Sequence, residues 1–145
     1  MKVRRGLFYT ASHEWVDFMP DGTARVGISD FVPQKRGKIS FLNLCDEGEY
    51  YQSGEVIGDA EAFKGVWDIS APISGTVLRI NDDLLDDPQS INSDPYGSWL
   101  AEFGDAERGA KLMTAQEYCK YLVKEAEMIS VSYTHLRAHE TDSYL

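Results

Sequence analysis

One lysine in this 145-residue chain lies between acidic neighbours, at a position where an enzyme could modify it. Lys64 lies in segment 61–68 with acidic neighbours, Glu61 and Asp68, and β-rich stretches with glycine-centred turns flank it. We expect the lysine at or near the tip of a hairpin, where an enzyme can reach it. A deprotonated ε-amine is a nucleophile, so its acylation would leave a flexible arm in solvent. An unmodified lysine would instead be a solvated charge that discourages strand pairing.

The other nucleophilic or basic side chains do not form a recognisable catalytic site. Cys45 and Cys119 lie far apart, without a CxxC or metal-type spacing, so we expect two reduced, buried thiols. His13 stands alone beside a glutamate and a tryptophan, which favours a structural hydrogen-bonding role. No nucleophile and base can be placed close together from the sequence, so we do not expect an independent enzyme.

Two further groups of side chains have the types that bind metal ions. The acidic segment 82–87 lacks the order of ligands around a central glycine that defines an EF-hand, so we predict a solvated loop. His135 and His139 are four residues apart, which would place both on one helix face. No third ligand or HExxH glutamate accompanies them, so we predict no metal site.

Short strands with frequent glycine turns make up the first hundred residues. Segment 7–28 is predicted to form a hairpin or meander around the Pro-Asp-Gly turn at 20–22. A short helical turn is expected in 29–36, followed by a half-buried strand over 38–44. Ile39 and Phe41 should point inward, with Leu42 or Leu44 as a further inward candidate. Segment 99–103 is expected to be the last strand. This pattern is typical of a barrel or sandwich.

A helix is predicted to follow the strands. Segment 114–117, Thr-Ala-Gln-Glu, is a capping box, in which threonine and glutamate satisfy each other's backbone N–H groups. Apolar side chains then recur at helical spacing and should pack on the β domain. These residues are Ala115, Tyr118, Cys119, Leu122 and Ala126.

Composition limits the possible partners. Hydrophobic residues make up 43% of the chain, enough for the core of one domain. The net charge of −10 repels nucleic acid and anionic membranes and favours partners with basic docking patches. The sequence contains neither an apolar run of transmembrane length nor a signal peptide. A cytoplasmic protein is the simplest interpretation.

The last seventeen residues differ from the rest of the chain. Segment 131–141 resembles translated adapter sequence, so we expect 129–145 to be a non-native or disordered tail. Residues 1–128 are expected to form the single functional domain.

Several short motifs, in this order and register, resemble one family over residues 7–127. The motifs are Tyr9-Thr10, His13-Glu14-Trp15-Val16, Val26-Gly27-Ile28-Ser29-Asp30, Gly37-Lys38-Ile39, Glu61-Ala62-Phe63-Lys64, Ala71-Pro72-Ile73-Ser74-Gly75, Asp94-Pro95-Tyr96-Gly97 and Trp99-Leu100. Together they resemble the H protein of the glycine cleavage system, a lipoyl carrier. The resemblance implies a mostly β fold: a barrel-sandwich hybrid of the lipoyl/biotinyl type, with two antiparallel sheets and a C-terminal helix.

The resemblance also implies a function for Lys64. By matching position, Lys64 would carry lipoate as an amide and act in a non-catalytic carrier. The arm would take the aminomethyl group of glycine from a pyridoxal-phosphate glycine decarboxylase to an aminomethyltransferase. A dihydrolipoyl dehydrogenase would reoxidise the arm, and a lipoate ligase or lipoyl transferase would attach it.

The neighbours of Lys64 are the expected recognition residues. Glu61 and Asp68 match positions that a lipoylating enzyme would recognise, although surface solubility alone would also explain them. Phe63 and Trp67 are expected to form an exposed aromatic pair that contacts partners.

Three alternatives remain open from the sequence. Ala62, Phe63, Gly65 and Lys38 depart from the usual family residues, which favours an H-like paralogue in lipoate relay or lipoyl-linked signalling. A biotinyl carrier has a similar fold, but its Met-Lys-Met motif is absent. A plain interaction module without a prosthetic group is the third.

Overall fold

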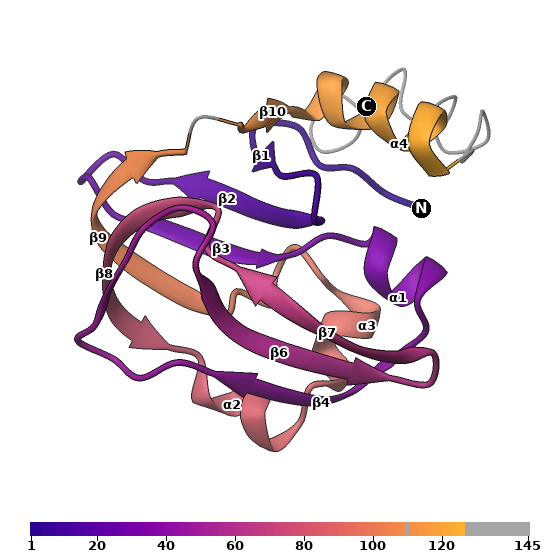
Figure 1. The fold of residues 1–145 in the computed structure, drawn as a ribbon, viewed down its shortest axis with the longest axis horizontal. Helices are drawn as coiled ribbons and strands as arrows, with labels where there is room; N and C mark the ends of the chain where they lie inside the picture. Colours follow the sequence, from indigo (N-terminus) through magenta and orange to yellow (C-terminus); the bar gives the residue numbers. More distant parts are fainter. Residues whose placement is uncertain (110, 127–145) are drawn as a thin grey trace.

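The computed structural model describes residues 1–109 and 111–126, which form two antiparallel sheets and four helices (Figure 1). The strands are β1 (Phe8–Tyr9), β2 (Glu14–Phe18), β3 (Ala24–Ile28), β4 (Ile39–Leu44), β5 (Tyr50–Tyr51), β6 (Val56–Ala62), β7 (Gly65–Ser70), β8 (Ile73–Ile80), β9 (Ala101–Arg108) and β10 (Met113–Thr114). The helices are α1 (Phe31–Lys35), α2 (Asp82–Asp86), α3 (Gln89–Ser93) and α4 (Ala115–Ala126). The predicted fold class, two antiparallel sheets with a C-terminal helix, is confirmed.

The larger sheet has the strand order β10-β1-β2-β3-β9-β8-β5, and the smaller sheet has the order β4-β6-β7. The predicted meander is the start of the larger sheet: β2 and β3 pair antiparallel from Glu14↔Ile28 to Phe18↔Ala24. Their turn closes where the Met19 N–H donates to the Thr23 carbonyl at 2.8 Å. In the described residues both sheets are open, so each retains two edge strands.

One hydrophobic core joins the two sheets. The smaller sheet contributes Ile39, Leu42, Ala60 and Ile69, and the larger sheet contributes residues such as Val16, Val26, Val77 and Phe103. Period-two alternation explains this, because successive side chains of a strand point to opposite faces. The outer face of the smaller sheet therefore points away from the core.

Helix α4 covers β1 through its predicted apolar face. Ala115, Tyr118, Cys119 and Leu122 are buried, and the Tyr118 ring stacks on Tyr9 at 4.4 Å between centroids. The capping box is confirmed: the Thr114 N–H donates to Glu117 Oε1 at 2.8 Å, and the Glu117 N–H donates to Thr114 Oγ1 at 3.2 Å. The side chain of Ala126, the tail at 129–145 and its two histidines lie outside what the structure describes.

Three details differ from the expectations. Phe41 is 58% exposed and points outward, because the register shifts between Ile39 and Phe41 and moves Leu42 to the core face. The acidic segment forms α2, with Leu84 buried, and is not a loop. Segment 99–103 contains only the start of a longer strand, β9, and β10 follows it as a further strand.

None of the helices in the described residues is long and apolar enough to cross a membrane. The same residues contain no group of three or more histidine, cysteine or acidic side chains arranged to hold a metal ion.

Candidate functional site

Lys64 lies in the two-residue turn that joins β6 to β7. Ala62 and Gly65 form the last pair of this hairpin, so Phe63 and Lys64 alone make the connection. Two-residue hairpin turns usually need a positive φ at a central residue. Here Gly65 takes the positive φ, at 143°, and Phe63 and Lys64 do not. The predicted hairpin position of Lys64 is confirmed.

The Lys64 side chain is exposed and has one defined contact. Its Nζ donates to the Lys35 carbonyl oxygen at 3.1 Å, although the two residues are 29 positions apart. Lys35 is the last residue of α1, where helix carbonyls lack intrahelical partners. The amine is therefore oriented by the segment that leaves α1 and is still accessible to solvent.

Segment 35–38, which we call the α1–β4 connection, runs beside the hairpin tip (Figure 1). Arg36 lies over the Trp67 ring at 5.2 Å and over the Phe31 ring at 5.9 Å. A Cβ atom on Gly37 would lie 3.8 Å from Phe63 Cβ. The two Arg36 contacts and the Lys64 hydrogen bond join the tip to α1, and the backbone at Gly37 lies close to Phe63.

Glu61 and Asp68 lie on the outer face of the smaller sheet, and both are exposed. Glu61 pairs with Val66, one step from the closing pair of the hairpin, and Asp68 pairs with Asp59 further along. Asp59 also accepts a hydrogen bond from Asn43 at 2.9 Å. The two predicted recognition carboxylates are thus on one face, at different distances from Lys64.

The two aromatic neighbours of Lys64 differ in exposure. Phe63 is 96% exposed, but Trp67 is half-buried and points to the core side of the sheet, opposite Ala60. The expectation of an exposed aromatic pair is therefore wrong for Trp67, because strand alternation turns it inward and Arg36 covers it. Sequence analysis missed Phe41 and Val66, which are 58% and 63% exposed and flank Glu61 on the outer face.

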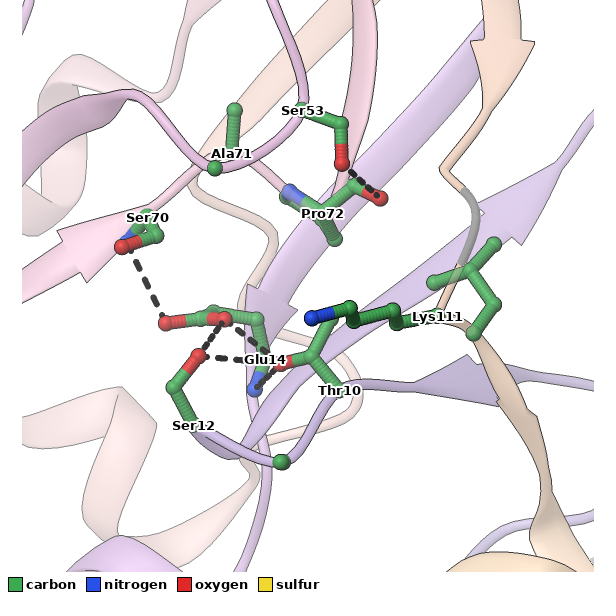
Figure 2. Close-up of a pocket in the computed structure, with 11 residues that line it drawn as sticks. Thr10, Ser12, Glu14, Ser53, Ser70, Ala71, Pro72 and Lys111 are labelled. Atoms are coloured by element: carbon green, nitrogen blue, oxygen red, sulfur yellow. Dashed lines mark hydrogen bonds between the residues drawn. The ribbon is translucent and has the colours of Figure 1, made fainter.

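A pocket of about 580 Å³ lies at the other end of β7, and Glu14 is buried in its wall (Figure 2). Glu14 Oε1 accepts hydrogen bonds from Thr10 Oγ1 and Ser12 Oγ, both at 2.6 Å. Its Oε2 accepts from the Ser70 N–H at 3.2 Å. Lys111, in the segment before β10, extends across the pocket toward Glu14.

Burial raises the pKa of Glu14, and the hydrogen bonds from Ser12, Thr10 and Ser70 partly offset that rise. A buried carboxylate in a pocket can accept hydrogen bonds from, or pair with, a small cationic group. Sequence analysis assigned Glu14 only to a strand. Thr10 and Ser12 are local partners, but the contact with Ser70, 56 residues later in the chain, could not be read from the local sequence.

The two cysteines and His13 occupy positions that favour structural roles over catalytic ones. Burial raises the pKa of Cys119 to about 12 and also raises that of Cys45, so both thiols stay protonated at neutral pH. Cys119 is buried as expected, whereas Cys45 is only half-buried. His13 is buried, and its Nδ1 lies 2.7 Å from the Tyr118 hydroxyl, in the structural hydrogen-bonding role that was predicted.

Comparisons with known proteins agree with this geometry. The family model for the glycine cleavage H-protein matches residues 7–125. The probable glycine cleavage system H protein of Pyrococcus abyssi is 40% identical over 124 residues, which cover 83% of this chain and 92% of that protein. The glycine cleavage system H protein of Lachnoclostridium phytofermentans is 40% identical over 127 residues, covering 88% of this chain and all of that protein.

A solved structure is similar in fold as well. The crystal structure of a glycine cleavage system H protein from Mycobacterium marinum matches with a TM-score of 0.74 and 36% identity, covering 83% of this chain and 97% of that chain. Sequence and fold agree over nearly the same residues. The chain therefore belongs to the glycine cleavage H-protein family.

Proposed function

We propose that this protein is the lipoyl carrier of a glycine cleavage system and that Lys64 bears the lipoyl group as an amide. The observation that carries the proposal is the position of Lys64, exposed in a two-residue turn at the end of a hairpin. A short turn between paired strands holds the root of the arm firmly and leaves the amine accessible. The amide removes the lysine charge and gives a long, rotatable tether.

Attachment of the group would use Lys64 as a nucleophile. Its nitrogen forms a bond to the acyl carbon of a lipoyl adenylate, the bond from that carbon to the phosphate oxygen breaks, and AMP departs with the electron pair. The nitrogen releases its protons to solvent. The Lys35 carbonyl, 3.1 Å from Nζ, can accept a hydrogen bond from the amine before the reaction and from the amide N–H afterwards.

The bound lipoyl group supplies all the redox chemistry of the cycle through its dithiolane. The chain itself presents the arm. The proposed partners are a pyridoxal-phosphate glycine decarboxylase, an aminomethyltransferase, a dihydrolipoyl dehydrogenase and a lipoate ligase or lipoyl transferase. We place the cycle in the cytoplasm. The names of the matched relatives support this function over an H-like paralogue in lipoate relay or signalling.

Intact-mass analysis after coexpression with a lipoate ligase tests the attachment. We expect one lipoyl amide on the wild-type protein and none on Lys64→Arg. Lys35→Arg is the matched control and should be modified, because only the backbone of Lys35 contacts the target amine. An unmodified wild-type chain would refute the proposal.

Exchange of labelled bicarbonate into glycine tests the specific pathway. The modified protein, mixed with a glycine decarboxylase, should support this exchange, and Lys64→Arg should not. A fully lipoylated protein that supports no exchange would favour the H-like paralogue.

A further inference from the structure

Three cations occur within four residues of a strongly acidic protein, and they lie beside the target lysine. Lys35, Arg36 and Lys38 belong to the α1–β4 connection, in a chain with a net charge of −10. Lys35 and Lys38 are exposed. Neither Lys35 nor Lys38 forms a salt bridge with a carboxylate of residues 1–109 or 111–126.

The connection holds these cations in a defined place. Arg36 is fixed between the Trp67 and Phe31 rings at 5.2 and 5.9 Å, and the Lys35 carbonyl accepts the hydrogen bond from Lys64. A guanidinium on ring faces is attracted to them without needing a carboxylate. Lys35 and Lys38 therefore flank a segment with defined contacts to α1 and to the hairpin.

The hairpin carries the opposite charge on its other side. Asp59, Glu61 and Asp68 are on the outer face of the sheet, whereas Trp67, which touches the connection, points to the core face. An approaching surface thus meets cations on one side of Lys64 and carboxylates on the other. Phe63, 96% exposed, lies in the turn between them.

We propose that Lys35 and Lys38 bind carboxylates at the active-site entrance of the enzyme that acylates Lys64. This inference rests on the proposed lipoylation. Complementary charges on both sides would fix the orientation in which the hairpin enters, and the ring of Phe63 would occupy an apolar site between them. The net negative charge of the chain repels an acidic surface at long range, so a local pair of cations beside Lys64 would favour the approach of that surface at the hairpin. The same net charge disfavours nucleic acid and anionic membranes as occupants of so small a basic patch.

Charge reversal tests the inference. We compare wild type, K35E/K38E and the control K120E/K124E as substrates of a lipoate ligase with ATP and lipoate, following lipoylation by intact mass. Lys120 and Lys124 are exposed on α4, and the two double variants change the net charge equally. We expect kcat/KM to fall about tenfold for K35E/K38E at low salt, with little change in kcat. The defect should shrink in 0.5 M salt, and the control should stay within about twofold of wild type.

The salt dependence separates docking from misfolding. Thermal unfolding must show that all three proteins are folded. If charge reversal destabilises the α1–β4 connection, the same assay is carried out with K35Q/K38Q, which removes the two charges without adding negative ones. Equal rates for K35E/K38E and wild type, an equal loss in the control, or a defect that persists in high salt would each overturn the inference. A wild-type chain that is never lipoylated would instead refute the proposed function, and with it this inference.

Discussion

The His13 ring and the Tyr118 hydroxyl join the first turn of the larger sheet to α4, with Nδ1 and the hydroxyl oxygen 2.7 Å apart. The same ring stacks on Phe31 of α1 at 3.9 Å between centroids. Burial, with a smaller contribution from the charge of Arg36, lowers the pKa of His13 to about 4. The packing between α1, α4 and the sheet thus depends on a neutral imidazole.

We predict that protonation of His13 destabilises the fold in mild acid. The pKa of His13 is depressed from 6.5 to about 4 in the folded protein. The stability that the neutral ring contributes is therefore fully present above pH 6.5 and is lost as the pH falls toward 4. The loss should reach about 2–3 kcal/mol by pH 4.5. His13→Asn is the comparison, because asparagine does not titrate and tolerates the φ of 74° at this position. Urea unfolding between pH 7.5 and 4.5 should show a smaller loss for the variant.

The variant loses a ring stack, so it should start from a lower stability at pH 7.5. The informative quantity is the pH dependence of the difference between the two proteins, which removes contributions from the carboxylates. Parallel curves across this range would contradict a buried, neutral His13.

We predict that Glu14 tolerates an amide far better than truncation. Glutamine can place its oxygen toward the Ser70 N–H and its NH₂ group toward the hydroxyls of Thr10 and Ser12, which can rotate to accept. Glu14→Ala leaves the Ser70 N–H without its acceptor and should cost about 1–3 kcal/mol. Chemical denaturation of both variants at pH 7 measures this. Equal losses would show that the negative charge, and not the hydrogen bonding, holds the pocket together.

We predict that Gly27→Ala destabilises the protein through a clash with Trp15. A Cβ atom at residue 27 would meet the Trp15 indole ring, which is buried and donates to the Pro95 carbonyl at 3.1 Å. Overpacking of this kind costs about 1–3 kcal/mol. Trp15→Phe shortens the ring system, so the cost of Gly27→Ala should be smaller in that background. Equal costs in a double-mutant cycle would exclude the clash as the cause.

Features with local causes were predictable from the sequence. The β2–β3 turn follows from the Pro-Asp-Gly chemistry at 20–22, and the start of α4 follows from a reciprocal pair of side chains three residues apart. The turn position of Lys64 is of the same kind, because it depends on neighbours in the same hairpin. Each of these signals is contained within a few residues.

Features that depend on pairing between distant residues were not predictable. One bulge between Ile39 and Phe41 reverses the faces of β4, and no residue type announced it. Contacts between Arg36 and Trp67 decide that the tryptophan is covered while Phe63 is exposed, although both are aromatic neighbours of the same lysine. Periodicity predicts that side chains alternate between the two faces of a strand. It does not predict which distant segment packs on each face.

We predict that Arg36→Gln loosens the hairpin tip from the α1–β4 connection. The substitution removes the cation from the Trp67 and Phe31 rings, so amide hydrogen exchange should rise in segments 35–38 and 62–65.

The charge of Arg36 also contributes to the low pKa of His13, so an NMR titration should place that pKa higher in the variant. It should stay below 6.5, because burial is the larger cause. Arg79→Gln is the control, since Arg79 lies over Trp99 at a similar 5.2 Å but contacts neither His13 nor the hairpin. The interpretation is contradicted if the His13 pKa shifts equally in Arg36→Gln and Arg79→Gln. It is also contradicted if hydrogen exchange in segments 35–38 and 62–65 of Arg36→Gln stays at the wild-type level.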